Sequence, residues 1–297
     1  FLVRMATRSQ FHFLIVLVFV FFSCYAQTNT CTCSCSTCEA CNFDRSVCDV
    51  VGADMINTDI VVASDCVIIT VDVLSITGRA GNDCIFIAGG VTVSGPVSLE
   101  NGDDCIRVLN AELQAPLTSA GTGADCLRAD GGILNSVSLG GGNDEVVLTG
   151  VTAESVSLGN GNDCAQCKGS TSPMVISNAL DGNGGDDCIL FDGGSSGAIN
   201  GGNDDDVIIV QRSTFGVVHG NANNDMLRVD DFQTTGLGRI QGGPGDDLIE
   251  AFKHNGGPLT IGGQGDFDTC CAAGTGVVPD CEATTSPCVE RCALRRI

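Results

Sequence analysis

Aspartate and glycine recur together along most of the chain, in a pattern that could build a row of cation ligands. The phrase is a Gly-rich turn followed by an aspartate, and it is most complete at Gly242-Gly-Pro-Gly245-Asp-Asp247. The candidate ligand carboxylates are those of Asp83, Asp104, Asp125, Asp144, Asp163, Asp187, Asp205, Asp225 and Asp247. The candidate turn glycines are Gly81, Gly102, Gly123, Gly142, Gly161, Gly185 and Gly245. Carboxylate and carbonyl oxygens are the ligands that Ca²⁺ prefers.

The spacing of these turns predicts a repetitive fold. The copies recur about every 20 residues between Asp65 and Asp268, a period that indicates a solenoid. After each aspartate the residues alternate, as in Ile106-Arg107-Val108, which predicts a strand with one buried face. A second strand, clearest at Val97-Ser-Leu99, leads into the next turn. We therefore expect an all-β, right-handed parallel β-roll with about ten coils of about 20 residues.

Stacking such coils brings the aspartates close to one another. Two carboxylates about 5 Å apart repel by about 3 kcal/mol at an effective dielectric of 20. Asp103, Asp186, Asp204 and Asp246 lie beside the row and add to the repulsion. Cations between successive turns would remove this cost. The alternative is that Gly, Asn and Asp serve only as good turn formers, with no ion bound.

The repeated phrase resembles the RTX, or haemolysin-type, calcium-binding nonapeptide Gly-Gly-x-Gly-x-Asp-x-(apolar)-x over about residues 65–269. The resemblance implies a parallel β-roll that holds several Ca²⁺ ions through the Asp carboxylates and turn carbonyls. The opposite turns, such as 193–197, lack the motif, so we expect one column of ions rather than the two usual in that family. Asn223 replaces a core glycine, the register near Asp204 and Asp205 is ambiguous, and the copy at Asp65 is expected to cap the stack.

Nineteen cysteines are present, and many follow the motif aspartate on the outward face of the predicted strand. This row comprises Cys66, Cys84, Cys105, Cys126, Cys164 and Cys188, with Glu145 interrupting it and Asp206, Met226, Leu248 and Thr269 ending it. Neighbouring strands lie within disulfide range. We hypothesise the coil-to-coil bridges Cys66–Cys84, Cys105–Cys126 and Cys164–Cys188, with stacked free thiols as the alternative. Cys167 is expected on the inward face, and Cys35-x2-Cys38 also resembles zinc-ligand spacing.

The ends of the chain differ from the repeat. Residues 1–26 comprise a few upstream residues and an apolar run, 13–22, typical of a secretory signal peptide cleaved after Ala26. We expect a Cys-rich segment at 27–50, the solenoid at 51–269 and a Cys-rich cap at 270–297. Dense cysteine in an exported chain favours disulfides, so the predicted location is extracellular.

Composition narrows the possible partners. The 14 basic and 36 acidic residues give a formal charge of −22, which excludes a nucleic-acid binder that relies on a basic surface. Calcium ions are the expected partners, with self-association or matrix and cell-surface components as further possibilities; membrane insertion is not expected. No catalytic motif is present, and His219 and His254 are expected in exposed turns, so we predict no enzyme. The expected function is a secreted calcium-binding β-roll with a structural, adhesive or extracellular-matrix role. The alternatives are an ice-binding solenoid and an acidic template for calcium mineral.

Overall fold

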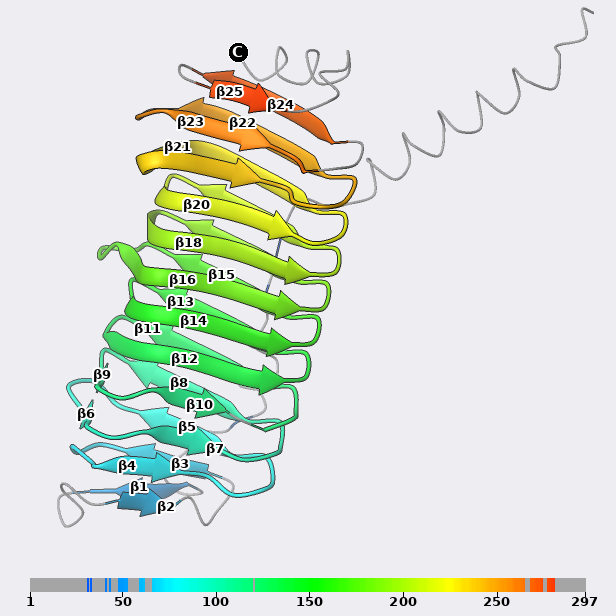
Figure 1. Ribbon diagram of the computed structural model, residues 1–297. Helices are drawn as coiled ribbons and strands as arrows, with labels where there is room; N and C mark the ends of the chain where they lie inside the picture. The colour runs from blue at the N-terminus through cyan, green and yellow to red at the C-terminus, as the bar shows by residue number, and fades with distance from the viewer. Residues whose placement is uncertain are drawn as a thin grey trace, which may run out of the picture. The chain divides into compact units, whose positions relative to one another are not determined.

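The computed structural model contains a stack of parallel β-coils (Figure 1). It describes residues 31, 33, 41, 43, 48–52, 59–61, 66–119, 121–264, 268–274 and 277–280. Every strand pair is parallel, and the described residues include no helix. The predicted all-β solenoid of about ten coils, each about 20 residues long, is thus confirmed. The predicted signal peptide at residues 1–26 and the capping copy at Asp65 lie outside the described residues.

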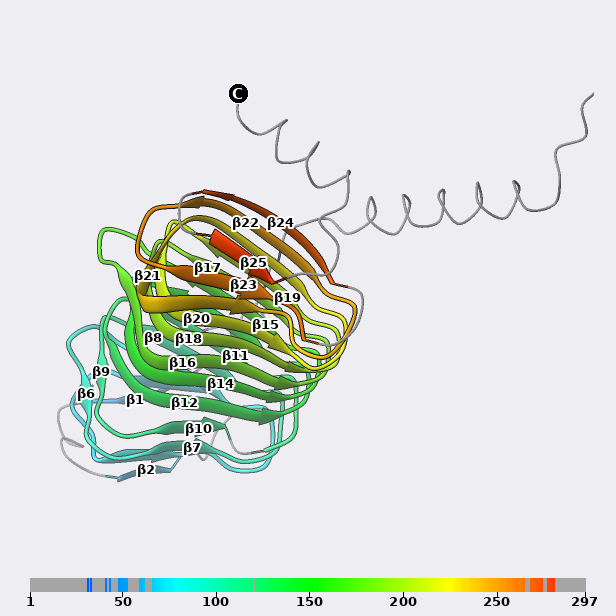
Figure 2. The ribbon, with the colours of Figure 1, turned by 45° about the horizontal axis from the view of Figure 1, so that its top comes forward.

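Two sheets face one another across the core (Figure 2). Sheet A contains β1 (Asp49–Val51), β3 (Cys66–Ile69), β5 (Cys84–Ile87), β8 (Cys105–Leu109), β11 (Cys126–Asp130), β13 (Glu145–Thr149), β15 (Cys164–Lys168), β17 (Cys188–Asp192), β19 (Val207–Gln211), β22 (Leu248–His254) and β24 (Thr269–Gly274). These are the strands predicted to follow each motif aspartate. The first part of β21 (Met226–Gln241) also belongs to sheet A, and its last part belongs to sheet B.

Sheet B contains the strands that lead into the Gly-rich turns. They are β2 (Asp59–Val61), β4 (Ser75–Thr77), β6 (Thr92–Val93), β7 (Val97–Leu99), β9 (Glu112–Leu113), β10 (Leu117–Ser119), β12 (Ile133–Gly141), β14 (Thr152–Asn160), β16 (Met174–Gly184), β18 (Gly194–Asn203), β20 (Thr214–Asn221), β23 (Leu259–Gly262) and β25 (Val277–Asp280). The strands extend from Asp49 to Asp280, so pairing continues beyond the 51–269 boundaries predicted for the solenoid.

Proline breaks sheet B in the early coils. Pro96 separates β6 from β7, and Pro116 separates β9 from β10. Proline cannot donate to a strand ladder, so pairing stops on either side of it. In the next coil Ser136 takes this place, and β12 runs unbroken through nine residues. The sheet B strands are therefore short near the N-terminal end, long from β12 to β20, and short again at β23 and β25, which have four residues each.

The core is a narrow aliphatic layer between the sheets. Alternate residues such as Ile106, Val108, Val137 and Leu139 are almost fully buried. The large aromatic side chains in this layer, Phe191, Phe215 and Phe232, all lie in the later coils. His254 is only 4% exposed and its ring centroid lies 4.9 Å from that of Phe232, so the prediction that it occupies an exposed turn is wrong.

The cysteine row exists, but two of its three predicted pairings, Cys66–Cys84 and Cys164–Cys188, are wrong. Cys66, Cys84, Cys105, Cys126, Glu145, Cys164 and Cys188 are in register on sheet A. The row continues through Val207, rather than the predicted Asp206, to Met226, Leu248 and Thr269. Cys66, Cys84, Cys164 and Cys188 are each bonded to a cysteine outside the row. Side chains on adjacent parallel strands project side by side instead of toward each other, which disfavours a bond within the row.

The row is bonded instead to the N-terminal segment. The bridges are Cys31–Cys188, Cys33–Cys164, Cys41–Cys84 and Cys48–Cys66, with Cα–Cα distances of 5.6, 5.6, 5.8 and 4.8 Å. Cys105 and Cys126 are disulfide-bonded as well. Cys167 is a free thiol buried in the core, as predicted. The disulfides are typical of proteins in oxidising, extracellular compartments.

Candidate metal-binding column

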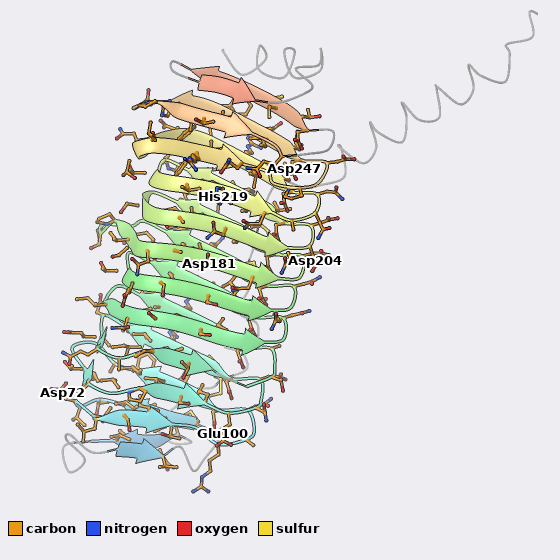
Figure 3. The ribbon with its side chains drawn as sticks, in the orientation of Figure 1. Asp72, Glu100, Asp181, Asp204, His219 and Asp247 are labelled. Carbon is orange, nitrogen blue, oxygen red and sulfur yellow. A yellow bond between two sulfur atoms is a disulfide. The ribbon has the colours of Figure 1, made fainter. Side chains whose placement is uncertain are left out.

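The motif aspartates form one continuous column at the entrance to sheet A. Its members are Asp83, Asp104, Asp125, Asp144, Asp163, Asp187, Asp206, Asp225, Asp247 and Asp268, and each is at most 6% exposed. We call this set the inner column. Each aspartate lies between a Gly-rich turn and the first residue of a sheet A strand. The alternation of inward and outward side chains along that strand therefore determines the position of the aspartate. Figure 3 places Asp247 at the edge of the stack where the turns lie, whereas Asp181 and His219 lie on the face of sheet B.

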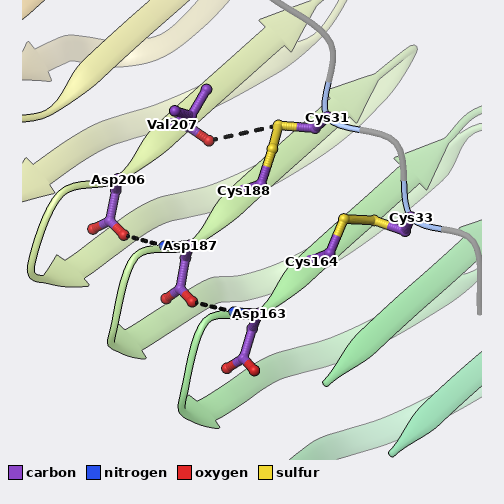
Figure 4. The surroundings of a disulfide bond; sticks show 8 residues. All are labelled: Cys31, Cys33, Asp163, Cys164, Asp187, Cys188, Asp206 and Val207. Atoms are coloured by element: carbon purple, nitrogen blue, oxygen red, sulfur yellow. Dashed lines mark hydrogen bonds between the residues drawn. A yellow bond between two sulfur atoms is a disulfide. The ribbon is translucent and has the colours of Figure 1, made fainter. Parts of the chain in front are cut away.

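One oxygen of each carboxylate links adjacent coils. The backbone N–H of Asp144 donates to Oδ1 of Asp163 at 2.7 Å, and the N–H of Asp163 donates to Oδ1 of Asp187 at 2.8 Å. Figure 4 shows two of these links, from Asp163 to Asp187 and from Asp187 to Asp206. The same bond recurs between every consecutive pair from Asp83 to Asp268, at 2.7–3.1 Å. The column is thus a hydrogen-bonded ladder along the stack.

The second oxygen of most of these carboxylates lacks a hydrogen-bond donor. The buried, unpartnered atoms are Oδ2 of Asp104, Asp144, Asp163, Asp187, Asp206, Asp225 and Asp247. A buried anionic oxygen without a partner is costly, so a proton or a cation is expected to neutralise it.

Burial shifts the titration of these groups. Loss of solvation raises the pKa of Asp163 to about 8 and that of Asp187 to about 7, and the charges of neighbouring column members raise both further. The backbone hydrogen bond to each carboxylate opposes the shift but does not outweigh burial. The pKa values of Asp104, Asp206 and Asp225 rise to about 7, and those of Asp144 and Asp247 to about 6, with burial again the main cause. Without a counterion, the members with the highest pKa values, such as Asp163, therefore retain protons near neutral pH.

The structure corrects one predicted ligand. Asp205, predicted for the inner column, is exposed, and Asp206 takes the inner position. Three consecutive aspartates, 204–206, made the register ambiguous. It is settled by the following strand, in which Ile208 and Val210 are fully buried and Val207 pairs with Cys188. The other predicted carboxylates all belong to the inner column, and Asp268 extends it.

The predicted turn glycines stack directly above one another. A Cβ atom on Gly142 would lie 1.7 Å from the carbonyl oxygen of Gly123, and one on Gly161 would lie 1.7 Å from that of Gly142. Gly142 and Gly161 also have φ of 138° and 136°, which L side chains rarely adopt. Of the predicted set, Gly81, Gly102, Gly185 and Gly245 share a positive φ with them. The glycines thus let the carbonyls of one turn face the next.

A second set of glycines, not predicted as part of the site, packs against the carboxylates. A Cβ on Gly182 would lie 2.1 Å from Oδ2 of Asp187, and one on Gly220 would lie 2.0 Å from Oδ2 of Asp225. Both glycines precede their aspartate by five residues, a spacing visible in the sequence. The unpartnered oxygen therefore lies in a cradle that any side chain would fill.

An outer ladder, which the sequence analysis also missed, runs beside the inner one. It is formed by the residue before most of the motif aspartates, here Asn82, Asp103, Asn143, Asn162, Asp186, Asp205, Asn224 and Asp246, and is interrupted before Asp125, where Ala124 can only donate its N–H. Its bonds run in the opposite direction: the N–H of Asp186 donates to Oδ1 of Asn162, and the N–H of Asp205 donates to Oδ1 of Asp186, both at 3.1 Å. The repeated Asn-Asp and Asp-Asp doublets in the sequence could have indicated this ladder. Because Asn and Asp both occur here, the outer ladder needs only an acceptor.

The available ligand atoms are of the type that calcium prefers. Carboxylate Oδ2 atoms and the Gly-rich turns offer only oxygen ligands. No group of three or more His, Cys, Asp or Glu side chains gathers around one point among the described residues. A cation in the column would therefore take one or two carboxylates and complete its shell with backbone carbonyls or water.

Comparisons with protein-family models, with curated proteins and with solved structures each give no match. The described residues contain no apolar helix long enough to cross a bilayer. The resemblance to the RTX repeat thus rests on the motif alone.

Proposed function

We propose that the chain is a secreted β-solenoid that binds several Ca²⁺ ions along the inner column and serves a structural, adhesive or extracellular-matrix role. The observation that carries the proposal is the run of buried Oδ2 atoms without hydrogen-bond partners. Asp163, Asp187 and Asp206 illustrate the arrangement, because Oδ1 of each accepts a backbone N–H of the ladder and Oδ2 has no hydrogen-bond partner. Calcium would neutralise these oxygens and oppose the repulsion between successive carboxylates.

The contrast between the two ladders supports a role for negative charge. Outer positions such as Asn162 and Asp186 use amide and carboxylate side chains interchangeably to accept the same backbone bond. The inner position is aspartate in every described coil. If an acceptor were all that the inner position required, asparagine would serve there as well. A charged group buried at every step is explained by a cationic ligand.

Calorimetric titration tests this proposal. The oxidised full chain, freed of metal and held at pH 7.5, is titrated with CaCl₂ and, separately, with MgCl₂. We expect saturable calcium binding and weaker magnesium binding, because Mg²⁺ requires a compact octahedral shell and gives up its water reluctantly. Absence of calcium binding at millimolar concentration would contradict the proposal and leave the aspartates as protonated turn formers.

An ice-binding role is a second candidate, favoured by one feature of sheet B. Thr77, Ser98, Thr118, Ser138 and Ser157 are in register on its outward face. The outward face of sheet A is less regular, because it carries mixed residues such as Phe86 and Arg107. The hydroxyl row ends at Asp181, so it covers only the earlier coils. Thermal hysteresis measured on the oxidised protein tests this candidate, and a freezing point equal to the melting point would exclude it.

A further inference from the structure

The N-terminal segment crosses the coils of sheet A as a covalent strap. We define the strap by its described residues, Cys31, Cys33, Cys41, Phe43 and Cys48. Going along the strap from Cys31 to Cys48, the bonded partners descend through β17, β15, β5 and β3. The direction of the strap along the stack is therefore opposite to the order of the coils in the sequence. Figure 4 shows its upper part, where Cys31 and Cys33 meet adjacent coils.

The strap also packs on the sheet that it crosses. The ring centroids of Phe43 and Phe86 lie 5.7 Å apart. The guanidinium of Arg107, on the adjacent strand β8, lies 5.9 Å from the centroid of the Phe86 ring. Cys31 and Cys48 are 2% and 6% exposed. The strap is thus anchored by covalent bonds and by aromatic contact.

This arrangement changes how the coils depend on one another. In a solenoid each coil contacts only its neighbours, so unfolding can begin at either end and proceed coil by coil. The strap joins coils that do not touch, because β3 and β17 are bonded to the same short segment. A coil at the N-terminal end cannot separate while the strap remains attached.

The strapped coils include those with the weakest pairing of their own. The strapped coil of β5 and the next coil, that of β8, have sheet B strands of two or three residues, interrupted at Pro96 and Pro116. From β19 onward the cysteine position is occupied by Val207, Met226, Leu248 and Thr269. Those later coils have sheet B strands such as β20, with eight residues, and a core that contains Phe215 and Phe232. The bridges Cys41–Cys84 and Cys48–Cys66 thus attach the strap to coils with short sheet B strands, whereas Cys31–Cys188 and Cys33–Cys164 attach it to coils with long ones.

We propose that the strap is a thiol-sensitive lock: a dithiol reductant releases it, and the N-terminal coils then open while the C-terminal coils stay folded. The thiolate of the reductant attacks one sulfur of a bridge and forms a mixed disulfide. Its second thiol then displaces the protein sulfur, so the reductant leaves as a cyclic disulfide and the protein gains two thiols. Two electrons and two protons pass to the protein for each bridge. The lock does not depend on the calcium proposal, since it acts through sheet A and not through the inner column.

Hydrogen exchange read by mass spectrometry tests the lock on the full chain. Folded, oxidised protein is treated with dithiothreitol at fixed calcium concentration, and the thiols are capped with iodoacetamide before labelling. We expect exchange in β3, β5 and β8 to accelerate by about tenfold or more, while exchange in β20–β22 changes by less than about twofold. Equal acceleration in all coils, or none in β3, β5 and β8 after complete reduction, would overturn the proposal.

Two paired variants separate the lock from a general effect of crosslinking. Cys41→Ser with Cys84→Ser removes a bridge to a coil with short strands, and Cys33→Ser with Cys164→Ser removes one to a coil with long strands. We expect the first pair to accelerate exchange more in its own coil. Chain entropy alone predicts the opposite order, because the bridges span 43 and 131 residues. The opposite order would therefore refute the lock.

Discussion

At the residue scale, the inner aspartate serves two purposes with its two oxygens. Oδ1 of Asp187 accepts the backbone N–H of Asp163, which satisfies a buried donor, while Oδ2 of Asp187 has no hydrogen-bond partner. An asparagine could perform the first function but could not supply a negative charge for the second. Stability of the turn and binding of the cation therefore depend on different oxygens of the carboxylate, and single substitutions can test each.

Asp163→Asn is expected to lower calcium affinity by about tenfold or more, because it removes one charged ligand from the column but keeps the Oδ1 acceptor. Asp186→Asn is the matched control. It changes the same side chain in the neighbouring outer ladder, where asparagine already occurs at Asn162 and Asn224. We expect calcium affinity within about twofold of the unchanged protein for this control. Calorimetric titration of both variants measures the difference; equal affinities for the two variants would contradict the assignment.

Protonation of the inner column predicts the pH dependence of stability without calcium. Burial raises the pKa of Asp163 to about 8 and that of Asp104 to about 7, above the usual 3.8. A group with a raised pKa in the folded state favours folding while it is protonated, and this contribution is lost as pH rises through the folded value. We therefore expect the melting temperature in metal-free buffer to fall between about pH 5 and pH 8. The melting temperature is measured by far-UV circular dichroism. A melting temperature that rose or stayed constant over that interval would contradict this expectation.

At the scale of the element, the sequence predicts the strands well because their cause is local. Alternation around Arg107 and Arg128 places Ile106 and Leu127 inside, and the structure confirms this. The assignment of Asp205 to the inner column was wrong because three consecutive aspartates precede β19. Only the burial of Ile208 and Val210 determines which of them lies in the column. The outer ladder was missed because its acceptors join residues in different coils, a relation that depends on exact stacking.

Close stacking of the turns makes a sharp prediction for two adjacent glycines. Gly142→Ala is expected to destabilise the protein by about 2 kcal/mol or more, since its Cβ would meet the Gly123 carbonyl oxygen at 1.7 Å and its φ is 138°. Gly141→Ala is the control, because the nearest atom to its Cβ, the carbonyl oxygen of Asn160, lies 3.7 Å away. Thermal or denaturant unfolding compares the two variants. Similar stability for both would show that the turns are not stacked as described.

At the scale of the whole molecule, the strap could not be predicted from the sequence. The sequence indicates disulfides, but spacing does not determine connectivity, and adjacent cysteines in the row appeared to be the natural partners. The actual partners are separated by up to 157 residues, as in Cys31–Cys188. Such pairs follow only from the path of the N-terminal segment across sheet A.

Peptide mapping under non-reducing conditions checks this connectivity. Digestion of the oxidised protein at low pH, which prevents exchange of disulfides, is expected to give linked peptides for Cys31–Cys188, Cys33–Cys164, Cys41–Cys84 and Cys48–Cys66. Cys167 is expected to remain unalkylated until the protein is unfolded, because it is fully buried and burial raises the pKa of its thiol to about 12. Recovery of Cys66 linked to Cys84 would contradict the strap.

We propose that divalent cations neutralise the unpartnered carboxylate oxygens between the coils. The most direct measurement is the melting temperature of the oxidised full chain at pH 8, first with EGTA and then with millimolar CaCl₂. At this pH the protons that could replace the ions are largely lost from groups such as Asp144 and Asp247, whose pKa values are about 6. We expect a clear rise in melting temperature on adding calcium, because a ligand that binds only the folded state stabilises it. The same melting temperature in both solutions would contradict the proposal.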